Sequence, residues 1–411
     1  MENSPLTEAT AVTEVYGTGQ KVIAAVLKYP RALYGDAVHA EDFCVEGRTI
    51  TGVYVSTELR GCITRKGNYV ALTLDTLDPA ASTCHFGRAP GERLQVEKAL
   101  LCVSQLRPLC AADKTILPPF FNQKTTKTDN GVADRFFTQS YPDPESGQVM
   151  RCNLFRPVHC IPRQKYPLVL FLHDAGACSE ELTAPLAQGN GAVVWARDAE
   201  SGRRPCFVAA PLYTTPCVDD AGRVGWEVDA TVRLVKALCK FYPIDPMRIY
   251  ATGQSMGCML LCEMLLRNPG FFAGSLLVAG QWDPARMARA TAENLWAVVS
   301  NGDERAFPVM RACMAEIERA GGNVSRGHLD ALSGASVLSE KIRRQNAEGC
   351  NANFTWFEER KSLALAGKQQ HISTWAKTYD IEELRTWLFE QRGGGPQRAQ
   401  PVIKKEQWSY V

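Results

Sequence analysis

The chain has 411 residues, 45% of them hydrophobic and 22% charged, which is typical of folded globular proteins and long enough for two domains. Lys and Arg number 46 against 44 Asp and Glu, so the formal net charge is only +2. Such a balance gives no strong field to attract nucleic acid or an anionic membrane. We therefore predict no nucleic-acid partner and no membrane partner.

The targeting and cysteine patterns are those of an intracellular protein. The first residues, MENSPLTEATAVTEVYG, contain no basic segment followed by an apolar one, and no run of about 18 apolar residues follows. We expect a cytoplasmic protein, or a secreted one if a signal has been removed. The 15 cysteines are odd in number and scattered, which favours reduced thiols over a disulfide framework. No CxxC pair occurs, so we expect no metal site.

The N-terminal quarter is rich in strand patterns. From about residue 12 to residue 106, short alternating segments with β-branched residues occur, such as RTITGVYVST and NYVALTLDT. They predict a small immunoglobulin-like β-sandwich over residues 1–112. The stretch LPPFFNQKTTKTDNG then predicts a linker at 113–132. We consider two roles for the sandwich: it shades the mouth of an active site, or it forms a homo-oligomer.

The pattern changes after the linker. FFTQSY and MRCNLFRP predict a strand pair, and the apolar runs PLVLFLH, CFVAAP, RIYATG, GSLLVAG and LWAVVSNGD then alternate with helical stretches. This alternation predicts an α/β domain at 133–392, with a mostly parallel sheet flanked by helices. NFTWFEE is the last strand and IEELRTWLFEQ the closing helix. Residues 393–411 are expected to form a flexible C-terminal tail.

One serine stands at the junction between a predicted strand and a predicted helix. In YATGQSMGCMLL, Ser255 is flanked by Gly253 and Gly257, a GxSxG pentapeptide. A sharp strand-to-helix turn crowds the backbone at both glycine positions and exposes the serine hydroxyl. Ser255 is therefore a candidate nucleophile, and the alternative is a helix cap.

A serine hydroxyl needs a base, and the chain has six histidines. Only His371 follows the last predicted strand, where the chain order serine, acid, histidine requires the base. Asp303, at the end of LWAVVSNGD, is the candidate acid that orients the imidazole. Its competitor is Asp283, and Glu304 is expected to face away. The alternative for His371 is a surface-loop histidine, and for the aspartates a solvated turn.

The loop after PLVLFLH supplies candidate donors for a developing negative charge. Small residues follow His173 in HDAG, so the backbone N–H groups of Ala175 and Met256 are expected to form an oxyanion hole. The alternative for HDAG is a plain tight turn.

These stretches together resemble α/β-hydrolase esterases of the prolyl-oligopeptidase-like and polyhydroxybutyrate-depolymerase-like group. The resemblance is carried by YPLVLFLHDAG, YPIDPMRIYATGQSMG, SNGDERAFP and HISTWAKTYDIEELRTWLF, and it runs from about residue 136 to residue 391. GQKVIAAVLKY and FCVEGRTITGVYV look like the immunoglobulin-like domain that precedes the hydrolase in some of these esterases. The resemblance implies an α/β-hydrolase fold.

The chain departs from the family pattern at a few positions. Asp174 stands where the family usually has Gly, and Cys258 replaces a second Gly after the elbow. The segment 321–370 is longer than a minimal hydrolase needs, so a helical insertion over the pocket is expected. Trp226 falls where the family often has an aromatic residue near the substrate, although core packing is its ordinary role. Asp174, Trp226 and Gln254 are the expected substrate-binding residues.

The resulting hypothesis is a serine hydrolase that cleaves carboxylic esters through an acyl-enzyme. Ser255 attacks, His371 transfers the proton, and Asp303 orients the imidazole. The partner is a small-molecule ester, and no cofactor is required. Two alternatives stay open: a serine peptidase of the prolyl-oligopeptidase-like type, and an inert binding or scaffold protein.

Overall fold

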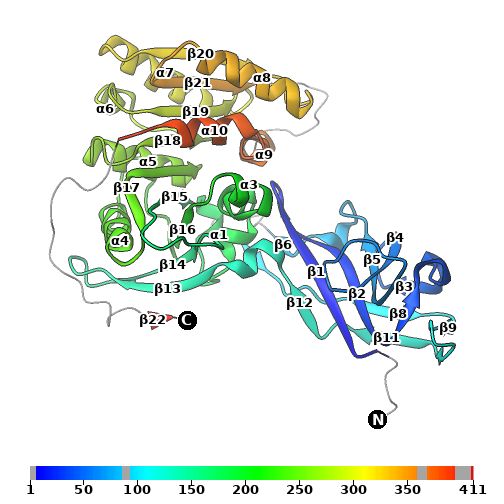
Figure 1. Ribbon diagram of the computed structural model, residues 1–411. Helices are drawn as coiled ribbons and strands as arrows, with labels where there is room; N and C mark the ends of the chain where they lie inside the picture. The colour runs from blue at the N-terminus through cyan, green and yellow to red at the C-terminus, as the bar shows by residue number, and fades with distance from the viewer. Residues whose placement is uncertain (1–5, 86–92, 359–367, 394–408, 411) are drawn as a thin grey trace. The chain divides into compact units, whose positions relative to one another are not determined.

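The computed structural model describes residues 6–85, 93–358, 368–393 and 409–410. The chain divides into two compact units (Figure 1). The first unit comprises residues 1–85 and 96–134, and the second comprises residues 86–95 and 135–411.

The first unit is a β-sandwich. One sheet has the order β12-β1-β2-β5-β4 and the other β11-β8-β3. Buried side chains from both sheets, such as Leu27 and Leu72 on one side and Val45 and Val103 on the other, form one core. The strands are β1 (Glu8–Tyr16), β2 (Gly19–Tyr34), β3 (Phe43–Val45), β4 (Ile50–Ser56), β5 (Lys66–Leu74), β8 (Cys102–Gln105), β11 (Phe120–Lys124) and β12 (Lys127–Asp129). Shorter pairs are β6 (Cys84–His85) with β7 (Gln95–Val96), and β9 (Leu109–Cys110) with β10 (Ile116–Leu117).

The structure corrects the predicted boundaries 1–112 and 113–132. Three strands, β10, β11 and β12, occupy the expected linker, and β11 pairs with β8 while β12 pairs with β1. β11 and β12 are edge strands, and exposed edges take the Lys, Thr and Asn residues that resemble a linker in sequence. The first unit therefore ends at residue 134, while residues 86–95 group with the second unit.

The second unit contains a ten-stranded sheet of order β20-β21-β19-β18-β17-β15-β16-β14-β13-β22. Neighbours from β20 to β16 are parallel, and the last three strands are antiparallel. The strands are β13 (Phe137–Pro142), β14 (Val149–Phe155), β15 (Tyr166–Leu172), β16 (Phe207–Leu212), β17 (Ile244–Gln254), β18 (Gly274–Val278), β19 (Leu295–Ser300), β20 (Val324–Leu329), β21 (Ala352–Phe357) and β22 (Ser409–Tyr410). In the predicted tail, residues 394–408 and 411 lie outside the described residues.

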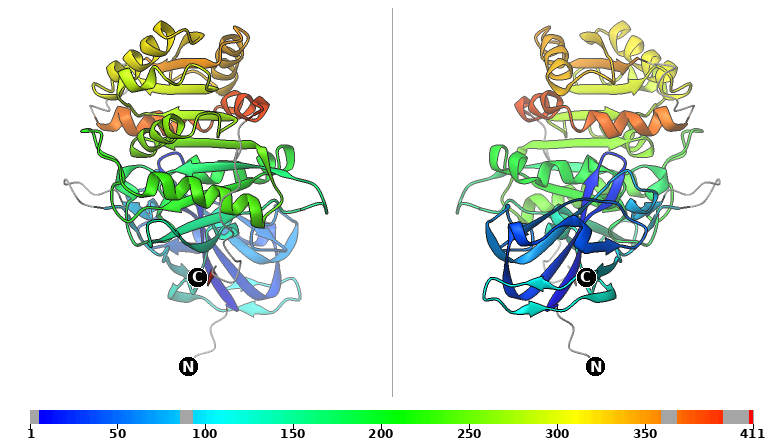
Figure 2. Two further views of the ribbon diagram at one scale, coloured as in Figure 1. Left: turned by 90° about the vertical axis from the view of Figure 1, so that its left-hand side faces the viewer. Right: turned by 90° about the vertical axis from the view of Figure 1, so that its right-hand side faces the viewer.

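Helices cover both faces of this sheet. One group consists of α4 (Glu227–Phe241), α5 (Met256–Arg267), α6 (Pro284–Met287) and α7 (Ala306–Arg319), and the other of α3 (Asp198–Arg203), α8 (Ala335–Asn346), α9 (Lys368–Thr378) and α10 (Glu382–Glu390). Figure 1 shows α4 and α6 on the side opposite α3, α8 and α9, and α4 stands in front of the sheet in the left view of Figure 2. Short helices α1 (Ala184–Ala187) and α2 (Asn190–Val193) pack near β16. Within the described ranges, no helix is long and apolar enough to cross a membrane.

The segment 321–370 differs from the expected roof over the pocket. It adds strand β20 and helix α8, and α8 packs against β20 and α10. β20 has the sequence VSRGHL, which is too polar to be recognised as a strand because it lies at the sheet edge. Residues 359–367 of this segment lie outside the described part of the chain.

A buried ionic cluster anchors α10, the helix that follows α9. Glu200 on α3 accepts hydrogen bonds from Arg204 Nε at 2.5 Å and from Arg385 Nε at 2.9 Å, and all three side chains are at most 13% exposed. Burial by itself would raise the pKa of Glu200, but the two guanidinium groups outweigh it and hold the pKa below its ordinary value. The carboxylate therefore stays ionised between the two helices.

We predict that Glu200→Gln lowers the free energy of unfolding by about 3 kcal/mol at pH 7, because two buried arginines lose their counter-charge. The Glu200 carboxylate contributes to the free energy of unfolding. This contribution is fully present above the pKa of Glu in the unfolded chain, about 4.3, and it is lost as the pH falls through the lower pKa of Glu200 in the folded protein. Urea unfolding followed by tryptophan fluorescence measures this, since all eight tryptophans follow residue 134. Equal stabilities of variant and parent at pH 7 would contradict the prediction.

Candidate active site

Ser255 occupies a strained turn between β17 and α5. Its φ is 53° and its ψ is −117°, a conformation that non-glycine residues rarely adopt. A Cβ at Gly253 would lie 2.3 Å from the carbonyl oxygen of Gly257, and a Cβ at Gly257 would lie 2.1 Å from that of Leu172. The Ser255 N–H donates to Val278 O at 3.0 Å, which ties the turn to β18. The two glycines are thus required by close backbone approach.

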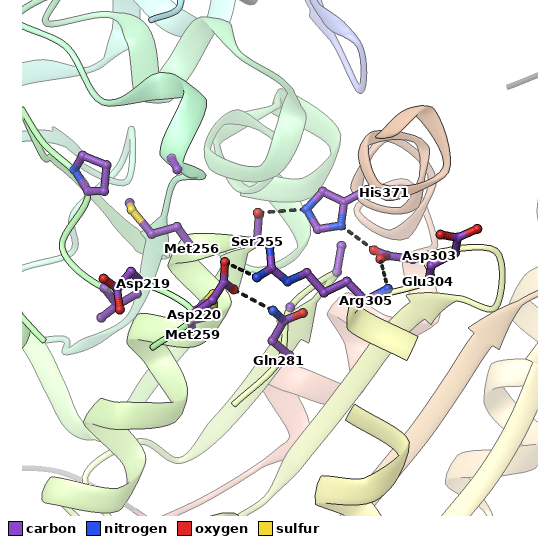
Figure 3. A pocket seen from close by; sticks show the side chains of 15 residues that line it. Asp219, Asp220, Ser255, Met256, Met259, Gln281, Asp303, Glu304, Arg305 and His371 are labelled. Carbon is purple, nitrogen blue, oxygen red and sulfur yellow. Dashed lines mark hydrogen bonds and ion pairs between the residues drawn. The ribbon is translucent and has the colours of Figure 1, made fainter. Parts of the chain in front are cut away.

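Three side chains from distant parts of the sequence form one hydrogen-bonded chain (Figure 3). His371 Nε2 lies 2.8 Å from Ser255 Oγ, and His371 Nδ1 is hydrogen-bonded to Asp303 Oδ2. Ser255 follows β17 and Asp303 follows β19. His371 was predicted on the loop that leads to the closing helix, but it lies in α9. The arrangement is that of a nucleophile, a base and an orienting acid.

Asp303 is buried yet favours its charged form. Burial by itself would raise its pKa, but the hydrogen bond and charge of His371 and two backbone N–H groups together hold the pKa below its ordinary value. The N–H groups are those of Ala306, at 2.9 Å from Oδ1, and Arg305, at 3.2 Å. The carboxylate is thereby fixed in place and able to stabilise a positively charged imidazole.

The loop after β15 is organised by Asp174. Its Oδ1 accepts a hydrogen bond from Gly176 N at 2.7 Å, and its Oδ2 accepts one from Gln254 Nε2 at 3.1 Å. The carbonyl of Gly176 in turn accepts from Leu94 N at 2.7 Å. Because both the N–H and the carbonyl of Gly176 are hydrogen-bonded, the loop holds Ala175 on the same cavity wall as Ser255.

His173 supports the same loop from beneath. Its Nε2 accepts a hydrogen bond from Tyr213 N at 3.0 Å, so Nδ1 carries the proton and donates to Asp174 O at 2.8 Å. Burial lowers the pKa of His173, and the ring is neutral. His173 therefore joins the ends of β15 and β16, and it is a structural residue of the loop.

A cavity of about 520 Å³ opens at Ser255. Its wall includes all three members of the hydrogen-bonded chain together with Ala175 and Met256, the two predicted oxyanion donors. The remaining lining residues are partly apolar and partly polar or charged, namely Pro216, Val218, Met259, Ala279, Gly280, Asp219, Asp220, Gln281, Glu304 and Arg305. A carbonyl carbon placed at Ser255 Oγ would thus lie in a cavity with both apolar and polar walls.

The three expected substrate-binding residues are not among those that line this cavity. Gln254 is fully buried and donates to Asp174 and to Gln188 Oε1 at 3.1 Å, so both Asp174 and Gln254 brace the loop from behind. Trp226 precedes α4 and is 36% exposed. The geometry therefore differs from the prediction of direct substrate contact for these side chains.

The competing acids are placed differently from Asp303. Asp283 caps α6 by accepting from the N–H groups of Ala285 and Arg286, so its carboxylate is engaged away from His371. Glu304 is exposed on the rim of the cavity and lines it, although it was expected to face away.

A contact that was not predicted from the sequence positions the first turn of α9, which carries His371. Ser300 Oγ donates to Gln370 Oε1 at 2.8 Å, and Gly302 N donates to Ser300 Oγ at 3.3 Å. The residue before the base is thus docked on the loop that carries the acid. The position of Gln370 next to His371 was the only feature of the sequence that bears on this contact.

Comparison with known proteins gives a family match for the N-terminal part of the chain and a structural match over most of its length. Residues 8–118 match the esterase Ig-like N-terminal domain family. A crystal structure of a thermostable esterase superposes with a TM-score of 0.81 and 27% identity, and the match covers 94% of this chain and 100% of that one. No curated protein sequence matches the chain significantly.

More distant structures include a mutant of the feruloyl esterase module from Clostridium thermocellum complexed with sinapinate. It has 11% identity and a TM-score of 0.39, and the match covers 65% of this chain and 91% of that one. This score is too low to support any inference.

The family and the strong neighbour confirm the predicted class, a carboxylic ester hydrolase with an immunoglobulin-like N-terminal domain. They also confirm the fold class, an α/β-hydrolase fold after a β-sandwich.

We predict that Gly302→Ala lowers kcat by about threefold to tenfold, because the added Cβ displaces the Gln370 amide from Ser300 and so removes a hydrogen bond worth about 1 kcal/mol. A Cβ at this position would lie 1.8 Å from Gln370 Oε1, the far end of a flexible side chain that can turn aside. Hydrolysis of p-nitrophenyl acetate by the folded variant measures the loss.

Removing the Gln370 amide provides the control. Gly302→Ala combined with Gln370→Ala is expected to be as active as Gly302→Ala alone, since both changes remove the same hydrogen bond to Ser300. Gly334→Ala is a matched substitution with no atom within 4 Å of the added Cβ. A double variant with a much larger loss than Gly302→Ala would refute this explanation.

Proposed function

We propose that the chain hydrolyses carboxylic esters through an acyl-enzyme formed on Ser255. The observation that carries this proposal is the hydrogen-bonded chain from Ser255 through His371 to Asp303 at the wall of the cavity. The similarity to a thermostable esterase over 94% of the chain supports an ester as substrate.

In the first half of the reaction, Ser255 Oγ forms a bond to the acyl carbon while its proton passes to His371 Nε2. Asp303, already ionised, stabilises the imidazolium that results. The N–H groups of Ala175 and Met256 are proposed to hold the oxyanion, since Met256 begins α5 and the first N–H groups of a helix lack intrahelical partners. The intermediate collapses, the C–O bond to the alcohol breaks, and the alcohol leaves with the proton from His371.

In the second half, His371 takes a proton from water, and the hydroxide formed attacks the acyl carbon. Collapse of this second intermediate returns the proton to Ser255 Oγ and releases the acid. The cycle consumes one ester and one water and needs only these side chains.

We predict that Ser255→Ala lowers kcat for p-nitrophenyl acetate by at least about 10⁴-fold, because the acceptor of the acyl group is lost. A fluorophosphonate probe is expected to label the parent protein and not the variant. Ser336→Ala, a change at an exposed serine of α8, serves as the matched control.

Two results would contradict the assignment. Unchanged turnover in the folded Ser255→Ala variant would exclude Ser255 as nucleophile. A parent protein that the probe leaves unlabelled would instead support an inert binding or scaffold protein.

A comparison of an ester and an anilide of the same acyl group separates esterase from peptidase. We expect kcat/KM for the p-nitrophenyl ester to exceed that for the p-nitroanilide by at least about 100-fold, because the amine must be protonated as it leaves, whereas p-nitrophenolate need not be. A clear preference for the anilide would favour the peptidase alternative.

A further inference from the structure

A second cavity adjoins the one at Ser255. It has a volume of about 500 Å³, close to the 520 Å³ of the first, and is lined on its far side by Trp282, Pro284 and Val309. Five residues line both cavities: Asp219, Asp220, Met259, Gln281 and Arg305. These shared residues form the partition between the first compartment, which contains Ser255, and the second.

The polar part of the partition is a bridge of three side chains. Arg305 Nη2 lies 2.6 Å from Asp220 Oδ2, and Gln281 Nε2 donates to Asp220 Oδ1 at 2.8 Å. Figure 3 shows the Arg305 side chain extending from the loop of Asp303 toward one oxygen of Asp220, with Gln281 at the second oxygen of the same carboxylate. We call this contact the Asp220–Arg305 bridge.

The bridge connects a hairpin to the loop of the catalytic acid. The hairpin runs from Cys217 to Gly225 and is closed at its base by a hydrogen bond from Gly225 N to Cys217 O at 2.7 Å. Its tip is held by Asp219, which pairs with Arg223. Asp220 is thus the hairpin residue whose carboxylate reaches across to Arg305.

This bridge is weak enough to open during turnover. The Arg305 and Asp220 side chains are 66% and 45% exposed, and exposed ion pairs of this kind are worth about 0.2–1 kcal/mol. Met259 also belongs to the partition, and its flexible thioether side chain can adapt to different occupants. Opening the bridge therefore joins the two compartments.

The position of the second compartment identifies the part of an ester that reaches it. His371 must protonate the leaving alcohol, so the alcohol lies on the His371 side of Ser255. His371 lines the first compartment, whereas Met259 continues into the second. The acyl chain is the part directed toward Met259.

The charged groups on the wall of the second compartment already have partners, which favours an uncharged chain. Asp219 pairs with Arg223, and Asp283 accepts hydrogen bonds from backbone N–H groups of α6. Arg286 is paired with Glu263 at 2.7 Å and Arg305 with Asp220, so each arginine on the wall of the second compartment already has a carboxylate partner. A carboxylate on the substrate would have to displace one of these pairs.

We propose that Asp220 and Arg305 determine the length of acyl chain that the enzyme accepts, an inference that rests on the proposed function. With the bridge closed, the acyl group is confined to the first compartment, which favours short esters. With the bridge open, a longer uncharged acyl chain extends over Met259 toward Trp282.

The test is the ratio of kcat/KM for p-nitrophenyl octanoate to that for p-nitrophenyl acetate. Asp220→Ala and Arg305→Ala are each expected to raise this ratio by about threefold to fivefold. This is the factor that corresponds to the free energy of one exposed ion pair. The backbone N–H of Arg305 that donates to Asp303 is retained in Arg305→Ala. The double variant is expected to match the single variants, because both changes remove the same interaction.

Further arms of the experiment separate the bridge from general charge effects. Arg223→Ala removes an arginine that pairs along the hairpin instead of across the cavity, and its ratio is expected to equal that of the parent protein. High salt screens the ion pair between Asp220 and Arg305. It is therefore expected to raise the ratio of kcat/KM values in the parent protein and not in Arg305→Ala. Val309→Trp, which fills the second compartment, is expected to remove the gain of Arg305→Ala.

An unchanged ratio in both Asp220→Ala and Arg305→Ala would overturn the inference, as would an equal rise in Arg223→Ala. The proposed function fails differently: acetate hydrolysis would then survive in Ser255→Ala. The two failures are thus distinguishable in one set of assays.

Discussion

The close approach between the end of β15 and the start of α5 is the constraint on which the site depends. Leu172 at the end of β15 pairs in register with Gly253 on β17, so the loop after one strand lies beside the turn after the other. Only glycine fits at position 257, because a Cβ there would lie 2.1 Å from the Leu172 carbonyl oxygen. The strained backbone of Ser255 follows from this packing, and the same packing brings Ala175 and Met256 to one cavity wall.

The second requirement is that the imidazole arrives from a distant part of the chain and is held accurately. His371 lies in the first turn of α9, and the neighbouring Gln370 docks on Ser300 beside the acid loop. Asp303 is buried but accepts two backbone hydrogen bonds besides that of His371, so its negative charge is stabilised where the proposed mechanism needs it. Further along the chain, α10 is anchored by the buried pair of Glu200 and Arg385.

Chemistry and substrate selection are separated in this architecture. The proposed catalytic groups stand at the ends of parallel strands and at a helix start, where backbone packing defines their positions. The groups proposed to select the acyl chain, Asp220 and Arg305, are exposed and lie on loops. Loops tolerate substitution better than the sheet does, so the substrate range can change while the hydrogen-bonded chain at Ser255 is retained.

The sequence by itself determined the elements with a strong local signal. These are the buried apolar strands β15 to β19, the long helices α4 and α5, and the glycine-flanked Ser255 between a strand and a helix. Chain order then restricted the base to His371, because the other histidines precede the last predicted strand. Only the tertiary structure revealed β11, β12 and β20, since edge strands carry polar residues and lack the expected alternation. The tertiary structure also decided which polar groups meet. Asp174 accepts a hydrogen bond from the buried Gln254, and Arg305 forms an ion pair with Asp220. The physical reason is that apolar periodicity depends on residues that are close in sequence. The partner of a polar side chain depends instead on which distant segments the fold brings together.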